Sequence, residues 1–581
     1  MIAFSFLDHL LFFSPFLIIF SILYINRNKN VRTLAGYFQA EGKLSWFVAG
    51  TAMVATTFAA DTPLAVTEIV RSKGVSGNWL WWYMAIGGLV TVFFFSKLWK
   101  RSGAKTDLEL IAIRYSGKEA KILRSFKALI IGGVLNIIIL GWVNLAMLKI
   151  IQVFFPEYSE ILILLMLIIV GILYTSFGGL KGISFIDVFQ FFLAWGGCVV
   201  YAYFILDLPS IGGVAGLVQK ITPEKVNFYP SFSSSIGLPV DHFIIMLTVI
   251  WWSSWYPGAE PGGGGYIAQR ILATENENAA MKSSLWFVLA HYFLRPWPWI
   301  LVALASLVAF PDLSEKESGK GFLLFLNEGL PIGLKGLILS AFLAAYLSTL
   351  ATHLNWGASY LVFDFWKPVL QKEKSDRYYL NVTYTLQFLT GVSSLFLAVY
   401  GMETVKGAWV FLLEASSGIG FVLIARWFYW RISAYTEILA MILSPICYTI
   451  FAIVLNLEFP YTILANSLTC TALLIMSTFF LPSSNPQLIK EFYLKVQPPH
   501  YFWKGLFKND PKSFSVFPSG LYISFLGVIS GFFVIISGLQ SIQGILWETK
   551  ILYVSIPILL TSILLLRFSL KKSLNHSLNN Q

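Results

Sequence analysis

Hydrophobic residues dominate the chain in long runs that are separated by short polar connections. A run of about 20 apolar residues is long enough to cross a bilayer as a helix. Fifteen such runs occur, near residues 7–26, 45–70, 79–99, 124–154, 160–177, 185–206, 242–259, 283–310, 333–363, 379–401, 407–430, 434–456, 461–481, 518–539 and 549–567. No connection reads as a large soluble domain. The pattern predicts an all-α polytopic membrane protein with about 15 spans.

Charge follows the same pattern. The chain is 57% hydrophobic and only 12% charged, with a net charge of +11. Lys and Arg concentrate in alternate connections, above all in residues 97–127, whereas "FPEYSE" (155–160) has none. Cytoplasmic loops of membrane proteins carry this excess. We expect a multi-pass protein of the cell membrane with its N-terminus outside and its C-terminus cytoplasmic, and no nucleic-acid partner.

Two of the runs are poor continuous helices. Residues 45–70 contain Asp61 and Pro63, and residues 242–259 lead into Pro257, Gly258, Pro261 and the four glycines 262–265. The two runs are five spans apart, as expected if spans two to six and seven to eleven form two halves that each begin with an interrupted helix. Interrupted helices free backbone groups for ions and substrates. The alternative is that Gly and Pro merely kink or end these spans.

Several chemistries lack their sequence signatures. The phosphate-binding pattern G-x-x-x-x-G-K-[ST] is absent, and the six histidines form no H-x-x-x-H pair. ATP-driven transport and an intramembrane metalloenzyme therefore have no support, and we do not expect an enzyme. Any active transport would draw on an ion gradient.

Two motifs resemble a known family. "YTSFGGLKGISFIDVFQ" (174–190) is similar to the signature of the sodium:solute symporter family, with Gly182 as a departure, and "YIAQRILATE" (266–275) is similar to its Q-R-x-L-A segment. The preceding "PGAEPGGGG" lacks the Asn-Gln pair of many members, which indicates an outlying branch. The resemblance runs from about residue 40 to about 430. It implies sodium coupling, alternating access and a leucine-transporter-like inverted repeat of five plus five helices.

The resemblance also implies a division of the chain. Residues 1–40 would form an extra N-terminal span and a basic inner loop. Residues 41–431 would form the ten-helix core, with repeat one near 45–206 and repeat two near 242–430. Residues 432–581 would add C-terminal spans and a cytoplasmic tail.

The segment "LAAYLSTLATHLN" (343–355) carries the predicted sodium site. Ala345, Ser348, Thr349 and Thr352 lie on one helix face by their spacing. In the family, an A-x-x-S-[ST] pattern supplies one carbonyl and two hydroxyls to sodium, which implies Ala345, Ser348 and Thr349. The alternative is that these hydroxyls bond to their own helix or to neighbouring helices.

The remaining sodium ligands are expected from the interrupted second span. Aligning "GTAMVATTF" (50–58) with the family pattern places the two carbonyls near Gly50 and Met53. Asp187 is implied as a second sodium position or part of sodium's exit path. A water-facing aspartate at the membrane interface is the competing interpretation.

His353 and Thr352 have no role that follows from the motif. A packed, hydrogen-bonded imidazole at His353 is favoured over a proton carrier.

Candidate solute contacts are polar or aromatic residues near the two interruptions. They are Thr56, Thr57 and Asp61 in the second span and Trp252 and Trp255 in the seventh.

Arg295, in "HYFLRPWPWI", joins these candidates because a guanidinium within a span needs a partner or ligand. Glu414 would be its ion-pair partner or a second solute contact; a purely structural pair is the alternative.

These expectations combine into one functional hypothesis. The chain is expected to be a sodium-coupled secondary active symporter that imports a small organic solute: a sugar, an amino acid or an organic anion. Proton coupling through Asp61, Asp187 or Glu414, and a sensor that has kept the fold but lost transport, remain alternatives. The partners are the solute and the lipid bilayer, and the oligomeric state stays open.

Overall fold

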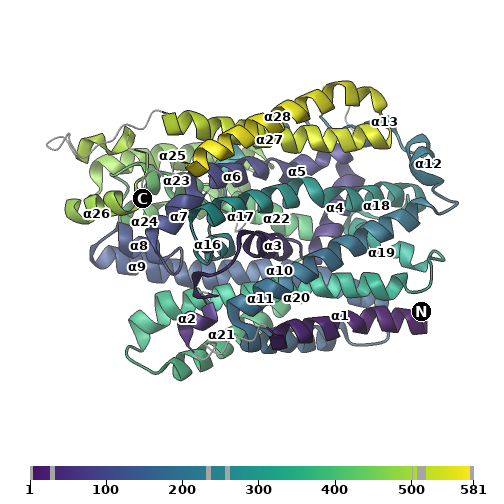
Figure 1. The fold of residues 1–581 in the computed structure, drawn as a ribbon, viewed down its shortest axis with the longest axis horizontal. Helices are drawn as coiled ribbons and strands as arrows, with labels where there is room; N and C mark the ends of the chain where they lie inside the picture. Colours follow the sequence, from purple (N-terminus) through teal and green to yellow (C-terminus); the bar gives the residue numbers. More distant parts are fainter. Residues whose placement is uncertain are drawn as a thin grey trace.

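The computed structural model describes residues 4–25, 33–38, 40–230, 237–255, 262–499, 501–506 and 519–575 of the 581-residue chain. These residues form an α-helical bundle whose long helices run along the longest dimension of the molecule (Figure 1). The N-terminus and α12 (Gly213–Lys220) lie at one end of the bundle. The helices α8 (Glu109–Arg114) and α26 (Pro486–Val496) lie at the other.

The predicted number of about 15 spans is not confirmed. Among the described residues, ten helical stretches are long and apolar enough to cross a membrane, or eleven if one bent pair of helices counts as a single span. The predicted spans at 7–26, 45–70 and 242–259 lie on helices that are shorter or interrupted. The predicted spans at 160–177 and 185–206 are joined in one helical stretch, which lowers the count again.

That joined stretch is α11 (Glu160–Leu206), which has 47 residues. At 1.5 Å per residue it would extend about 70 Å, more than twice the ~30 Å hydrocarbon core. Gly179 interrupts it with φ 52° and ψ −162°, which are not helical values. The signature motif therefore forms a sharp connection between two helical segments.

The second predicted span is broken, as expected. Helix α3 (Trp46–Thr57) ends at Thr57, and α4 (Asp61–Lys73) begins after the three intervening residues 58–60. Pro63 lies in the first turn of α4, where the N–H that proline lacks has no helical partner in any case. The backbone around residues 58–60 is buried within the bundle.

The seventh predicted span is broken as well. Helix α14 (Val240–Ile245) continues through η6 (Met246–Ile250) into α15 (Trp251–Ser253), and the chain resumes a helix at α16 (Tyr266–Leu272). Positive φ angles at Gly263 and Gly265 explain why glycines precede α16. The predicted breakers Pro257, Gly258 and Pro261 lie outside the described residues.

Other helices of the bundle pack around these broken ones. In chain order they are α5 (Trp79–Trp82), α6 (Met84–Val90), α7 (Ser96–Ser102), α9 (Gly117–Leu129), α10 (Asn136–Phe154), α17 (Glu277–Leu289), α18 (Pro296–Ala309), α20 (Leu334–Tyr360), α21 (Asp376–Tyr400), α22 (Val405–Ala415) and α23 (Gly420–Phe428). The last two are bent by 49° relative to each other.

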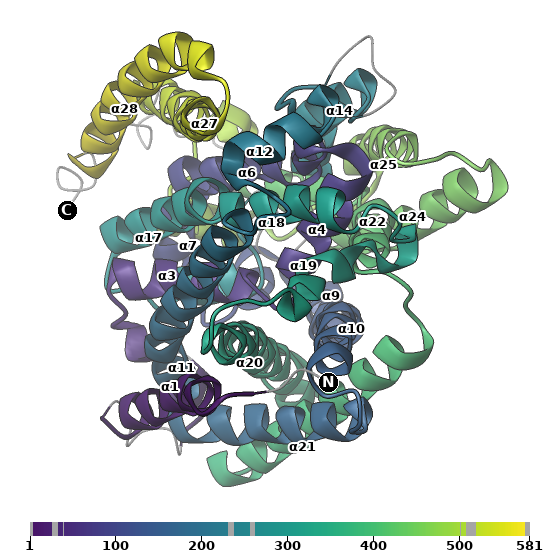
Figure 2. The same ribbon diagram turned by 90° about the vertical axis from the view of Figure 1, so that its right-hand side faces the viewer.

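Helix α20 occupies the interior of the bundle. Viewed down the helices, it lies between α1 (Phe6–Ile25), α11 and α10 (Figure 2). It also packs against α3, and almost all of its side chains are buried. Its Ser and Thr side chains therefore meet protein groups rather than lipid.

The C-terminal helices lie at the edges of this core. Helices α27 (Ser519–Leu546) and α28 (Leu552–Asn575) pair along one side (Figures 1 and 2), and α27 also packs against α6. Helices α24 (Ala434–Tyr448) and α25 (Tyr461–Phe480) pair elsewhere on the periphery. A buried ion pair between Lys127 of α9 and Glu437 attaches α24 to the core.

Candidate functional site

The break after α3 presents a backbone oxygen to α20. Carbonyl groups in the last turn of a helix have no later N–H of that helix to bind. The carbonyl of Thr56 instead accepts a hydrogen bond of 2.9 Å from the hydroxyl of Thr349. The hydroxyl of Thr56 lies 3.1 Å from that of Thr352, one turn further along α20. Hydroxyl and carbonyl groups thus join the broken helix to the central one.

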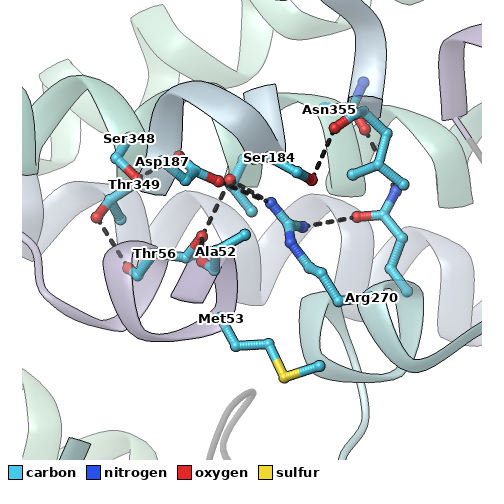
Figure 3. Close-up of polar contacts among 12 residues, drawn as sticks. Ala52, Met53, Thr56, Ser184, Asp187, Arg270, Ser348, Thr349 and Asn355 are labelled. Atoms are coloured by element: carbon cyan, nitrogen blue, oxygen red, sulfur yellow. Dashed lines mark hydrogen bonds and ion pairs between the residues drawn. The ribbon is translucent and has the colours of Figure 1, made fainter. Parts of the chain in front are cut away.

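The polar face of α20 gathers further oxygens at this point (Figure 3). The hydroxyl of Ser348 donates to the carboxylate of Asp187 on α11 at 2.6 Å. Thr349 also contacts the carbonyl of Ala345 at 3.1 Å. All four residues are buried. Carbonyl, hydroxyl and carboxylate oxygens are the donors that a hard cation such as Na⁺ prefers, so this cluster is chemically suited to hold one.

Asp187 is fully buried rather than facing water. Besides Ser348, its carboxylate lies 3.5 Å from the guanidinium of Arg270 on α16. The sharp connection at Gly179 lets the second segment of α11 bring Asp187 against α20. The alternative of a water-facing interfacial aspartate does not describe its position.

Arg270 links α16 to the central helix α20 and to α11. Its guanidinium donates to Thr352 at 2.8 Å and to the side-chain oxygen of Gln269 at 3.0 Å. Gln269 in turn donates to Asn355 at 3.2 Å. Figure 3 shows Arg270 reaching from α16 towards Asp187. A buried guanidinium therefore sits beside the oxygens of the candidate cation site.

The two backbone positions predicted for sodium, Gly50 and Met53, lie before Thr56 on α3. Gly50 faces α17, since a Cβ atom there would lie 2.6 Å from the carbonyl of Ser283. The carbonyl of Met53 accepts the hydroxyl of Thr57 at 2.7 Å, and its side chain points away from Ser348 and Thr349 in Figure 3. The carbonyl of α3 that accepts a hydrogen bond from α20 is that of Thr56.

A cavity of about 60 Å³ lies between the two broken helices. Four of the predicted solute contacts line it: Thr56, Thr57, Asp61 and Arg295. Tyr266 of α16 closes one side, with its hydroxyl 3.0 Å from that of Thr57. Aromatic and polar side chains complete the walls, including Trp81, Trp142, Trp409, His291 and His353. Thr349 borders both this cavity and the oxygen cluster.

The two charged residues of the cavity come from different halves of the chain. Asp61 is the first residue of α4, and Arg295 immediately precedes α18. The guanidinium of Arg295 lies over the rings of Trp299 and Phe58, 5.2 and 5.6 Å from their centroids. It also donates to the carbonyl of His291 at 3.1 Å. Stacking on aromatic rings holds this cation in the protein interior.

Three predicted solute contacts do not line this cavity. The indole N–H of Trp252 donates to Thr248 of its own helical segment at 2.8 Å. The backbone of Trp255 pairs with the side chain of Ser416. Glu414 lies beside Thr462 of α25. Neither tryptophan lines the cavity: Trp252 lies within α15, and Trp255 lies two residues beyond its end.

His353 is packed and hydrogen-bonded. Its Nδ1 lies 2.7 Å from the side-chain oxygen of Asn136 on α10, and its ring packs edge-on against Trp356. The favoured interpretation of this residue agrees with these contacts.

Sequence reasoning missed the functional position of Arg270. Arg270 lies within the Q-R-x-L-A segment, and a guanidinium in an apolar helix needs a buried partner, as argued for Arg295. Tyr266 and the wall residues Trp81, Trp142 and Trp409 had no signal of their own, because aromatic residues are frequent throughout this chain.

Comparisons with known proteins identify the family. The model of the "Sodium:solute symporter family" matches residues 37–443. The chain belongs to this family. Members are transporters rather than enzymes, and Na⁺ is the coupling ion. With its apolar helices, this makes the chain a multi-pass membrane protein.

Relatives within the family are distant. A sodium/glucose cotransporter of Vibrio parahaemolyticus is 24% identical over 65% of this chain and 72% of its own length. The sodium/sialic acid symporter of Proteus mirabilis is 21% identical over 64% of this chain and 74% of its own length. An uncharacterized symporter of Escherichia coli is 22% identical over 84% and 85% of the two chains.

The fold is also shared with a solved structure. A Na⁺-coupled sialic acid symporter, in a substrate-bound outward-open state, superimposes with a TM-score of 0.66 at 17% identity. The match covers 83% of this chain and all of the other. The expected leucine-transporter-like architecture is thereby supported, and at this identity the match speaks to fold alone.

Proposed function

We propose that this chain is a symporter that uses the inward flow of Na⁺ to import a small organic solute by alternating access. The observation that carries the proposal is the hydrogen bond between Thr349 of the central helix and the carbonyl of Thr56 at the break of α3. Sodium bound between these groups would join two elements that alternating access must move relative to each other.

The sodium site is proposed from the oxygens that meet there. They are the carbonyls of Thr56 and Ala345 and the hydroxyls of Ser348 and Thr349. Hydroxyls that now donate to protein oxygens can rotate to turn their lone pairs to a cation. Thr56 replaces Gly50 and Met53 in this proposal.

Asp187 is proposed as part of the path by which sodium leaves. Arg270 lies 3.5 Å from its carboxylate and supplies a positive charge that opposes a second resident cation at the same oxygens. A carboxylate whose charge is already balanced suits brief passage better than lasting coordination.

The solute is proposed to bind in the cavity between the broken helices. Asp61 and Arg295 bring one negative and one positive side chain to its walls, so they offer no net charge to balance an anion. Aromatic faces at Trp81, Trp142 and Trp409 suit the apolar face of a ring. A neutral polyhydroxylated solute such as a sugar, or a zwitterion such as an amino acid, fits these walls better than an organic anion.

Coupling follows from the position of Thr349, which borders both sites. Sodium that holds α3 against α20 would preorganise the solute cavity, and its loss to the cytoplasm would release both. The cavity of about 60 Å³ is small beside typical ligand sites of roughly 300–1,000 Å³, so the walls must move apart to admit a solute.

Uptake into proteoliposomes with separately imposed Na⁺ and H⁺ gradients tests the proposal. A thermal-shift screen of sugars, amino acids and organic acids, in Na⁺ and in K⁺ buffer, first selects the solute. We expect wild-type uptake to follow the Na⁺ gradient and Ser348→Ala/Thr349→Ala to lose it. Ser359→Ala is the control, because this buried hydroxyl of α20 bonds only to the Trp356 carbonyl among the contacts described.

Two results would contradict the proposal. Uptake that follows the H⁺ gradient without Na⁺, and is unchanged in the double variant, indicates proton coupling. Sodium-dependent stabilisation by a solute that is never transported indicates a sensor of the same fold.

We also propose a division of the chain and an orientation in the membrane. Residues 41–431 would form the transporting core, flanked by 1–40 and 432–581. With the N-terminus outside, the end of the bundle that holds α8 and α26 faces the cytoplasm.

A further inference from the structure

A second and larger cavity lies far from the proposed solute site. It has a volume of about 750 Å³ and is formed by α8, α9 and the segment η10 (Leu361–Leu370) that continues α20. Under the proposed orientation it opens at the cytoplasmic end of the bundle. None of the residues assigned above to sodium or solute lines it.

The charges of this cavity are unbalanced. Arg124 forms an ion pair of 2.6 Å with the buried carboxylate of Asp364. Three lysines remain on the walls, at positions 121, 367 and 372, against one further carboxylate, Glu373. All three lysines are exposed. The cavity therefore presents a net positive charge to whatever enters it.

The structure also positions one of these charges. The ammonium group of Lys367 lies 5.1 Å from the centre of the Tyr379 ring, a distance typical of a cation–π contact. Pro368 follows it and restricts the backbone. A lysine held in this way loses less freedom when it binds an anion.

The helical segments that form the cavity also carry exposed apolar side chains. Ile122, Phe126 and Leu129 follow at helical spacing on α9, and Ile122 is 61% exposed. On the other wall, Val369 is 53% exposed and Leu370 is 48% exposed. Exposed apolar side chains of this kind are expected where a membrane protein meets acyl chains.

We propose that this cavity binds the headgroup of an anionic phospholipid of the inner leaflet, with the lysines at positions 121, 367 and 372 around the phosphate and the acyl chains along Ile122 and Phe126. Basic pockets between membrane helices at the cytoplasmic surface suit such headgroups. A soluble phosphate would use the same charges but would leave the adjoining apolar surface uncovered.

Native mass spectrometry of the full chain in detergent tests this, with dioleoyl phosphatidylglycerol and dioleoyl phosphatidylcholine as probes. We expect preferential retention of phosphatidylglycerol by the wild type. Lys121→Gln/Lys367→Gln/Lys372→Gln should weaken it by roughly fivefold for each lysine. Lys495→Gln/Lys571→Gln/Lys572→Gln removes the same charge from exposed positions of α26 and α28 outside the cavity and should leave retention unchanged.

A second variant guards against indirect effects of removing three lysines. Val369→Glu keeps every lysine and adds a carboxylate at the exposed edge of the cavity. It should also reduce retention of phosphatidylglycerol but not of phosphatidylcholine. Equal loss in the two triple variants, or equal retention of both lipids by the wild type, would overturn the proposal. Full displacement of phosphatidylglycerol by equimolar inorganic phosphate would overturn it in favour of a soluble anion.

Discussion

At the scale of single residues, the proposed chemistry depends on the Thr349 hydroxyl, the Thr56 carbonyl and the ion pair between Arg270 and Asp187. Thr349 contributes a hydroxyl that meets both its own helix and the break of α3. Arg270 and Asp187 are both fully buried, so each depends on the other for charge compensation. The consequences of removing these groups can be predicted separately.

Thr349→Ala should weaken sodium binding without preventing folding. The change removes one proposed ligand and leaves the Thr56 carbonyl without its hydroxyl partner. We expect the sodium concentration for half-maximal thermal stabilisation to rise about tenfold, which corresponds to about 1.4 kcal/mol. Thr349→Ser, which keeps the hydroxyl, should restore most of the affinity. An unchanged sodium dependence in the alanine variant would exclude Thr349 as a ligand.

Arg270→Gln should destabilise the protein, because it leaves the Asp187 carboxylate buried without a counter-charge. Removing one partner of a buried pair costs about 3–5 kcal/mol. Adding Asp187→Asn should recover part of this loss, which a double-mutant cycle of unfolding temperatures in detergent would measure. Additive losses in the double variant would show that the two residues do not interact.

At the scale of the element, glycine positions set where the long helices turn and how closely they approach. Gly179 combines a left-handed φ of 52° with close packing, since a Cβ atom there would lie 2.9 Å from the carbonyl of Tyr37. Gly196 is on the same helical stretch and has open space around it. Replacing each of these two glycines by alanine therefore compares a position that requires a positive φ with a position that requires only a helical conformation.

Gly179→Ala should lower stability and Gly196→Ala should not. Residues other than glycine rarely adopt the backbone conformation of Gly179, and forcing one into it costs about 1–3 kcal/mol. The new methyl group would also press on Tyr37. Alanine at Gly196 should be neutral or slightly stabilising because it favours a helix. Thermal unfolding of the two purified variants provides the comparison; equal unfolding temperatures would mean that the turn at Gly179 tolerates a side chain.

At the scale of the whole molecule, the distribution of charge and the proposed orientation can be tested directly. The described cysteines, Cys198, Cys447 and Cys470, are all buried, so we expect them to react little with a reagent that labels exposed thiols. Asp312 and Lys374 are exposed and lie at opposite ends of the proposed topology.

A membrane-impermeant maleimide should label Asp312→Cys in intact cells and label Lys374→Cys only after the membrane is opened. The expectation follows from the excess of Lys and Arg in the connections assigned to the cytoplasm. Labelling of Lys374→Cys alone in intact cells would reverse the proposed orientation.

Much of the fold could be predicted, but the backbone ligands could not. Broken helices at 45–70 and 242–259 follow from local Gly, Pro and polar residues, which act on the backbone where they stand. The residue at which α3 ends does not follow in the same way, since packing between helices decides it. The helix ends at Thr57, and the proposed carbonyl is that of Thr56.

Composition and spacing alone are enough to predict that this chain crosses a membrane many times, that two helices are interrupted, and that Ala345, Ser348 and Thr349 share a face. These properties depend on composition and on spacing within one helix. The folded arrangement was needed to show that Asp187 and Arg270 contact Ser348 and Thr352. It was also needed to show that Trp252, Trp255 and Glu414 do not line the cavity. Contacts between helices distant in the chain depend on the rotation and packing of each helix, which its own periodicity does not specify.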